Sequence, residues 1–210
     1  MVKGSSRRHQ LSSSAPRGFG RLVATAASAL ALAVFPGFCA ADPSDALATV
    51  ASVDLDRYLG RWYEIARLPN RFESQCASDV EARYRREPAG IQVLNRCRKA
   101  DGGISESKGH AKIVAGSQNA KLRVTFFWPF YGDYWILALD PDYTEVLVGA
   151  PSRKFAWVLA RRPDMPEDRL ASLLARAQAL GFDSSAFLKT AQLKPLVQPT
   201  APVDGDGGSR

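Results

Sequence analysis

Histidine is nearly absent from this 210-residue sequence, which holds only two. Histidine is the usual general base and the commonest metal ligand, and outside the basic N-terminal segment only His110 remains. No Gly-x-Ser-x-Gly elbow accompanies it, and Cys76 and Cys97 lack the spacing of zinc ligands. The sequence therefore predicts a protein without a cofactor, a metal site or catalytic residues.

Acidic residues are missing from the first 41 positions, which carry five of the 28 Lys and Arg residues. Removing those five leaves 23 basic against 21 acidic residues, a net charge of +2. No phosphate-cradling glycine loop and no stripe of alternating aromatic and basic residues appears in the rest. We expect no nucleic-acid partner.

A long hydrophobic run is also missing, since Leu22 to Phe35 spans 14 residues and a membrane-spanning helix needs about 20. A basic segment followed by a short apolar run is typical of a secretory signal, here residues 1–41. Two interpretations of Cys39 are open. In the first, Cys39 is acylated as in a lipoprotein, although Phe38 occupies the position where a small residue is usual. In the second, cleavage after Ala41 removes Cys39 with the signal.

Two cysteines, Cys76 and Cys97, lie within the exported domain, and an oxidising compartment favours a disulfide between them. Pairing Arg86 with Ile91 across the first hairpin would place Cys97 opposite Val80. Cys76 would then have to fold back from ahead of its strand.

Eight short β-prone runs alternate with turn residues at a spacing of about 12 residues, as in an all-β barrel or sandwich. Leu122 and Val124 alternate with Lys121 and Arg123, so one face points inward and the other meets water. The runs are Trp62 to Leu68, Asp79 to Arg86, Ile91 to Arg98, Ser105 to Val114, Ala120 to Phe127, Tyr134 to Asp140, Tyr143 to Ala150 and Lys154 to Arg161.

The run from Tyr134 to Leu139 is apolar on both faces and needs a cover on its outer side. Pro166 to Leu180 supplies one amphipathic helix, with an Asp164-x-x-Glu167 capping box and a stop at Gly181. We expect residues 42–56 to form a mobile lead-in, 57–192 the folded domain, and 193–210 a disordered tail.

Residues Gly60 to Arg67 read Gly-Arg-Trp-Tyr-Glu-Ile-Ala-Arg, which resembles the Gly-x-Trp signature that opens lipocalins. Segments 126–132, 138–143 and 157–163 resemble further lipocalin motifs in the same order. The form of the signature in this sequence resembles that of the bacterial outer-membrane lipocalin (Blc) and apolipoprotein D branch. The resemblance spans about residues 55 to 190.

The resemblance implies an eight-stranded antiparallel up-and-down barrel with the C-terminal helix on its wall. In the signature formed by Gly60 and Trp62, Trp62 would close the barrel floor, and Arg161 would lie across the Trp62 ring. It also implies a fatty acid or lysophospholipid ligand, a lipid anchor in the outer membrane and, in some members, a homodimer. The protein would work in the periplasm or on the periplasmic face of the outer membrane.

Alternation alone selects the inward-facing candidates for a ligand pocket, and a one-residue slip of register would turn any of them outward. They are Tyr84, Val93, Val124, Phe126, Tyr134 and Ile136. Two alternatives to a carrier stay open. One is a lipocalin-like enzyme using Glu64, His110 or a pocket tyrosine, and the other is an envelope-stress protein whose barrel is filled by its own side chains.

Overall fold

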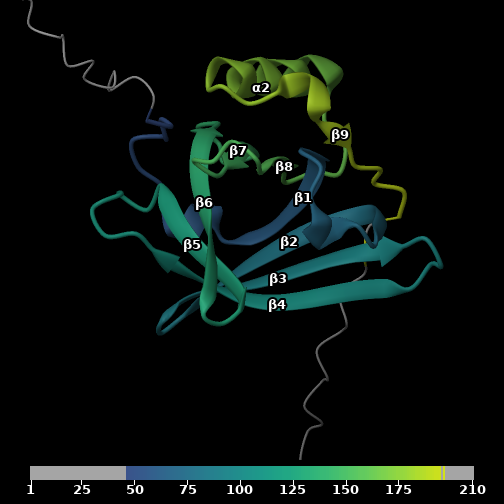
Figure 1. Ribbon diagram of the computed structural model, residues 1–210, viewed down its shortest axis with the longest axis horizontal. Coiled ribbons are helices and arrows are strands. Elements are labelled where there is room, and N and C mark those ends of the chain that lie inside the picture. The colour runs from purple at the N-terminus through teal and green to yellow at the C-terminus, as the bar shows by residue number, and fades with distance from the viewer. Residues whose placement is uncertain (1–45, 195, 197–210) are drawn as a thin grey trace, which may run out of the picture. The chain divides into compact units, whose positions relative to one another are not determined.

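The computed structural model describes residues 46–194 and 196, and these form a closed antiparallel β-barrel with a helix against its wall (Figure 1). Each of the first seven strands pairs with the next in the chain, and β1 also pairs with β8, which closes the ring of eight. The eight barrel strands are β1 (Gly60–Arg67), β2 (Cys76–Glu87), β3 (Gly90–Lys99), β4 (Ile104–Ile113), β5 (Lys121–Phe127), β6 (Phe130–Leu139), β7 (Glu145–Gly149) and β8 (Ala156–Ala160). The predicted eight-stranded up-and-down barrel is confirmed.

Two apolar clusters lie on opposite faces of the sheet, one inside the barrel and one on its outer wall. The inner cluster joins side chains from around the ring, among them Trp62, Tyr84 and Ile136. The outer cluster joins the next residues along the strands, such as Tyr63 and Leu137, to the C-terminal helix. This alternation follows from the period of two along a strand, and it decides which side chains reach the interior.

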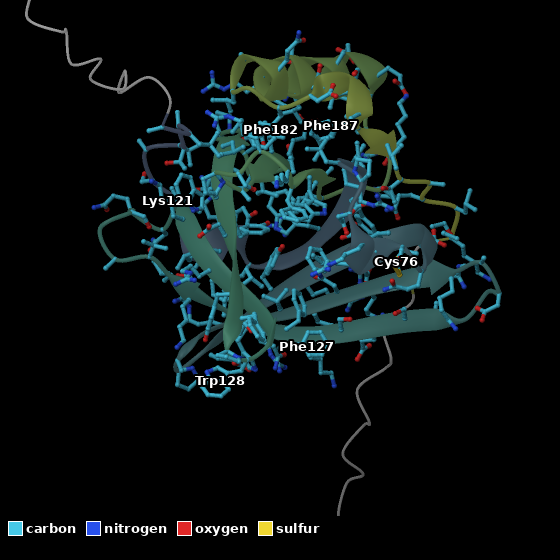
Figure 2. All side chains as sticks on the ribbon, in the orientation of Figure 1. Cys76, Lys121, Phe127, Trp128, Phe182 and Phe187 are labelled. Carbon is cyan, nitrogen blue, oxygen red and sulfur yellow. A yellow bond between two sulfur atoms is a disulfide. The ribbon has the colours of Figure 1, made fainter. Side chains whose placement is uncertain are left out.

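Helix α2 (Glu167–Ala179) covers the outer wall, and its Leu170 and Ala177 are buried there. The predicted cover for the doubly apolar strand is confirmed, and Figure 2 shows Phe182 and Phe187 between the helix and the barrel. The predicted capping box is wrong, because Pro166 takes the N-cap position and no side chain bonds there. None of the helices in the described part of the chain is long and apolar enough to cross a membrane.

The lead-in bonds to the barrel where the structure describes it, and its expected mobility stays a prediction. The Val50 N–H donates to the Ile136 carbonyl at 3.0 Å, and the Val53 N–H donates to the Gln118 carbonyl at 2.9 Å. Asp54 then caps helix α1 (Leu55–Tyr58), which precedes the barrel floor. Short apolar segments can be ordered by backbone bonds to a barrel end, which composition alone does not reveal.

The disulfide between Cys76 and Cys97 is confirmed, with a Cα–Cα distance of 5.5 Å. Arg86 pairs with Ile91 as expected, but β2 has two register shifts, between Glu81 and Ser78 and between Ser78 and Cys76. Extra residues on one strand of a pair form β-bulges. They bring Cys76, opposite Lys99, to within reach of Cys97.

The C-terminal segment fills a gap between β1 and β2, which pair only from Gly60 to Tyr63. After η2 (Arg71–Glu73) in the β1–β2 connection and η3 (Ser184–Ala186) beyond α2, the two-residue β9 (Leu188–Lys189) pairs with β1. The Thr190 N–H then donates to the Ile65 carbonyl at 2.9 Å, and the Asp79 N–H donates to the Ala191 carbonyl at 2.8 Å. The segment therefore bonds to both strands and seals the seam.

The predicted signal peptide with Cys39, and all of the predicted tail except Leu193, Lys194 and Leu196, lie outside the described residues. Lys194 donates its backbone N–H to Asp79 at 2.8 Å.

Candidate ligand-binding site

Trp62 forms the floor of the barrel interior and is fully buried. Its indole N–H donates to the Tyr58 carbonyl at 2.8 Å, and the Arg161 guanidinium lies 3.9 Å from its ring centre. The expected cation–π contact is therefore present. Gly60 has a φ of +96° and lies under Arg161, where a Cβ would come within 3.3 Å of the guanidinium, so a glycine is required.

Five of the six residues selected as pocket candidates lie in the inner cluster or pack against it, namely Tyr84, Val93, Val124, Tyr134 and Ile136. Phe126 is different: it is 37% exposed, and its ring lies over Gly109, where an added Cβ would come within 2.8 Å of it. Alternation predicts its strand face correctly, but the position is near the end of β5, where the wall no longer encloses a side chain. Contact of these residues with a ligand stays a prediction.

Three tyrosine hydroxyls meet inside the barrel. The Tyr134 hydroxyl lies 2.7 Å from that of Tyr58, and the Tyr84 hydroxyl donates to it at 3.0 Å. Burial raises the pKa of Tyr84 to about 12 and raises the pKa values of the other two as well. The hydroxyls are thus neutral and mutually satisfied, and they leave the surrounding wall apolar.

A second polar group lies where β1 approaches the β1–β2 connection. Glu64 is buried, pairs with Arg67 at 3.4 Å and accepts a hydrogen bond from Thr190. Arg67 also holds Glu73 at 2.9 Å, and Glu73 accepts from the Trp157 indole N–H at 3.2 Å. Burial, and then the nearby Glu73 charge, raise the pKa of Glu64 to about 8, so this carboxyl is mainly protonated at neutral pH.

Glu64 faces the interior because its partner across the β1–β8 ladder, Leu159, belongs to the inner cluster. The cluster around Arg67 therefore places two carboxyls and one guanidinium beside the apolar inner cluster, with a net charge near zero while Glu64 is protonated. Such a group can hydrogen-bond the polar end of an amphipathic molecule without creating a strong anion or cation site.

His110 lies away from this group. Its side chain is 64% exposed and contacts Glu87 at 3.1 Å. Its strand neighbour Ala111 faces the interior, so His110 faces outward. Glu64 and His110 thus cannot act together as an acid–base pair, and no cluster of metal-binding side chains occurs among the described residues.

Tyr58, Arg67 and Glu73 were missed by the sequence analysis as interior residues. Tyr58 lies before the first predicted strand, and Glu73 lies in a connection, so periodicity could not place either. Arg67 is inside the quoted signature, but the β-bulge between Glu64 and Ala66 shifts the alternation on which its direction depends.

Comparison with known proteins agrees with this architecture. A family model described as a lipocalin-like domain matches residues 53–192. Temperature-induced lipocalin-1 from Arabidopsis thaliana is 39% identical over 168 residues, covering 75% of this chain and 90% of that protein. Outer membrane lipoprotein Blc from Escherichia coli K12 is 36% identical over 169 residues, covering 80% and 96%.

Among solved structures, insecticyanin from the tobacco hornworm Manduca sexta matches with a TM-score of 0.58 at 21% identity, covering 70% of this chain and 84% of that one. This likeness concerns the fold alone. The family match and the relatives go further, and with the Gly60, Trp62 and Arg161 floor they establish that the chain belongs to the lipocalin family, whose members bind small hydrophobic molecules.

Proposed function

We propose that the barrel binds a single long-chain fatty acid or lysophospholipid and carries or buffers it in the bacterial cell envelope. The observation that carries the proposal is the inner wall, where Val93, Val124 and Ile136 surround an interior that ends on Trp62. An eight-stranded barrel has room for its own side chains or one small ligand. The neutral cluster at Glu64 and Arg67 suits the polar end of such a molecule.

The energetics favour a chain rather than a compact ligand. Burying ten methylenes contributes about 8 kcal/mol at about 0.8 kcal/mol each, from which the cost of immobilising the ligand is subtracted. Each two further methylenes should tighten binding about tenfold, since about 1.4 kcal/mol corresponds to that factor. Affinity should climb with chain length until the interior is full and then level off. Headgroup changes should matter less.

Titration of delipidated protein with fatty acids of increasing length tests the proposal. Trp62 belongs to the inner cluster and Trp157 packs against it, whereas Trp128 is 81% exposed and would add a signal unrelated to the interior. We would therefore follow quenching in a Trp128→Phe background. Saturable binding that strengthens with length supports the proposal, and binding at no length refutes it.

A matched pair of variants locates the ligand. Val124→Trp adds bulk to the inner wall, whereas Leu94→Trp adds it to the outer face, because Leu94 pairs across the sheet with Arg83 and Lys108. Val124→Trp should shorten the chain length at which affinity levels off, and Leu94→Trp should leave it unchanged. Equal titrations for both variants would exclude the interior as the site.

An enzyme and a filled barrel remain the alternatives. The outward position of His110 removes one acid–base partner from the first, and Glu64 with the tyrosines offers only weakly acidic groups. For the second, lipids extracted from protein purified from its native host and measured by mass spectrometry are decisive. A stoichiometric lipid supports the carrier, an altered lipid supports the enzyme, and an empty barrel that also binds nothing supports the structural protein.

We propose that the protein acts in the periplasm or on the periplasmic face of the outer membrane. The basic, then apolar N-terminal sequence and the disulfide support export, and the Escherichia coli relative is called an outer membrane lipoprotein. A lipid anchor at Cys39 and a homodimer remain expectations. Separating membrane and soluble cell fractions by sedimentation tests the location of the protein. Analytical ultracentrifugation measures its oligomeric state.

A further inference from the structure

Two positively charged side chains face each other across strands β4 and β5. Lys112 is the direct partner of Arg123 in the ladder between these strands. Their neighbours Ala111 and Val124 belong to the inner cluster or pack against it, so Lys112 and Arg123 both point outward. Like charges directly opposite each other in a sheet are destabilising. An anion that lies near both cations would relieve their repulsion.

Another pair of opposed cations on the barrel wall carries its own anion. Arg61 is the partner of Arg83 across β1 and β2. A carboxylate oxygen of Glu81 lies 3.6 Å from Arg61 Nε, and the second oxygen lies 2.8 Å from the Arg83 guanidinium. The barrel therefore neutralises this pair from within the chain.

The Lys112 and Arg123 pair has no such counter-charge. Among the described residues, no carboxylate lies within ion-pair distance of either cation. This holds even for Asp133, which is the partner of Arg123 across β5 and β6. The wall thus presents two positive charges together that the described part of the chain leaves for an anion from outside.

The two cations line a hollow in the outer wall. The hollow measures about 320 Å³ and is also lined by Ile113, Val114 and Tyr131. Tyr131 is half-buried, and the charged groups of Lys112 and Arg123 lie 5.6 and 5.4 Å from its ring centre. Sites for small molecules have volumes from about 300 Å³ upward. The hollow is therefore large enough for a small ligand.

The groups around the hollow suit one class of anion. Arg123 has a fork of N–H donors that matches two oxygens of a phosphate, and Lys112 adds a second positive charge. The Tyr131 hydroxyl makes no hydrogen bond within the described residues and can donate a further one. Ile113, 42% exposed, and Val114 form an apolar edge. Two cations beside an apolar edge match a doubly charged phosphate on a carbon skeleton better than a singly charged carboxylate.

We propose that the hollow over β4, β5 and β6 binds the phosphate monoester of a small organic molecule. The phosphate lies between Lys112 and Arg123, as a glutamate does at the other opposed pair, and the carbon skeleton packs on Tyr131 and Ile113. The hollow opens on the outer face of the wall, so this site is separate from the barrel interior. The inference goes beyond the proposed function and does not need a loaded barrel.

Isothermal titration calorimetry of the full chain tests the proposal at low ionic strength, where charges are least screened. The probes are glucose 6-phosphate, glycerol 3-phosphate, inorganic phosphate and glucose. A phosphate monoester should bind at one site per chain and at least tenfold more tightly than inorganic phosphate, and glucose should not bind. Preference for glucose 6-phosphate identifies a sugar as the source of the phosphate, and preference for glycerol 3-phosphate identifies a lipid headgroup.

A pair of variants with equal net charge locates the site. Lys112→Gln with Arg123→Gln should weaken binding of the phosphate monoester at least tenfold. Lys121→Gln with Lys154→Gln is the control and should leave binding unchanged. Lys121 also faces outward on β5 and lies 4.0 Å from the ring centre of Trp135, but it does not line the hollow (Figure 2).

Two single variants test the roles of the cations. Arg123→Lys keeps the charge but loses the fork of donors, so binding should weaken several-fold. Lys112→Glu supplies the missing anion within the chain, so it should abolish binding and raise the urea midpoint. Circular dichroism and fatty-acid titration of each variant show that the barrel is intact, which separates a loss of phosphate binding from a loss of the proposed function.

Three results would overturn the inference. The parent could fail to bind either phosphate monoester, or the variant lacking Lys112 and Arg123 could bind as tightly as the parent. Alternatively, the control variant could lose as much affinity as that variant, which would reduce the binding to a general attraction between phosphate and a positively charged protein.

Discussion

Replacing Arg161 with methionine should destabilise the barrel markedly, although Arg161 is not one of the residues proposed to contact the ligand. Its guanidinium donates to the carbonyls of Arg61 at 2.7 Å, Arg57 at 2.7 Å, Tyr58 at 3.1 Å and Tyr143 at 3.2 Å. These bonds tie the segment before β1 and the β6–β7 connection to the end of β8. Methionine keeps much of the apolar stem and removes the charge.

The magnitude follows from what the guanidinium leaves behind. After the substitution, water can hydrogen-bond some of the four carbonyls. We assume that one carbonyl stays buried without a partner, which costs about 1 to 3 kcal/mol. The lost contact with Trp62 adds about 0.5 to 2 kcal/mol. The free energy of unfolding should fall by about 2 to 4 kcal/mol. With a slope of about 2 kcal/mol per molar urea, the midpoint should fall by about 1 to 2 M.

Arg162→Met is the matched control, because the neighbouring Arg162 is 79% exposed and pairs only with the exposed Asp164 in the described structure. Urea unfolding of both variants, with the disulfide intact and followed by circular dichroism, should show a shifted midpoint for Arg161→Met alone. Equal urea midpoints for the two variants would refute the stabilising role assigned to Arg161 at the barrel floor.

The remaining predictions concern a buried acid and the cysteines. The folded state raises the pKa of Glu64 from 4.5 to about 8, so its contribution to stability is present below pH 4.5 and is lost as the pH rises towards 8. Glu64→Gln should remove this fall in urea midpoints between pH 5 and 8, whereas parallel pH profiles would contradict the assigned burial. Replacing Cys76 and Cys97 by serine should cost about 3 kcal/mol, since the bridge closes a loop of about 20 residues; if thiol labelling of unreduced, denatured protein finds both cysteines free, the bridge does not form. The preceding Phe38 should make acylation of Cys39 inefficient, and labelled fatty acid that is incorporated and then lost in Cys39→Ser would show the reverse.

The sequence predicts the strands and the core faces well because a half-buried strand must alternate. Val93, Ile136 and their neighbours on the inner wall follow directly from that period. Alternation fails where a strand is irregular, as at the β2 bulges. At Phe126 it gives the correct face but not the burial, because β5 ends there. The predicted run that starts at Tyr134 begins too late, because Phe130 to Asp133 already belong to β6.

Contacts that join distant parts of the chain could not be predicted from the sequence. The packing of the lead-in at the closed end depends on backbone bonds that leave no pattern in composition. The interior cluster of Glu64, Arg67, Glu73 and Thr190 unites a strand, a connection and the C-terminal segment, and only the folded register brings them together. The floor was predictable because the lipocalin signature names its residues.

The C-terminal segment that bonds to both β1 and β2 has a consequence for the order of assembly. Residues separated by more than 100 positions, such as Ile65 and Thr190, must meet before the seam closes. Contacts of such high sequence separation are slow to form, and synthesis from the N-terminus delivers this segment after all eight strands. The barrel is therefore unfinished until the last residues of the segment are made, and truncation before Leu188 should leave β1 and β2 unbridged beyond Tyr63 rather than merely shorten a tail.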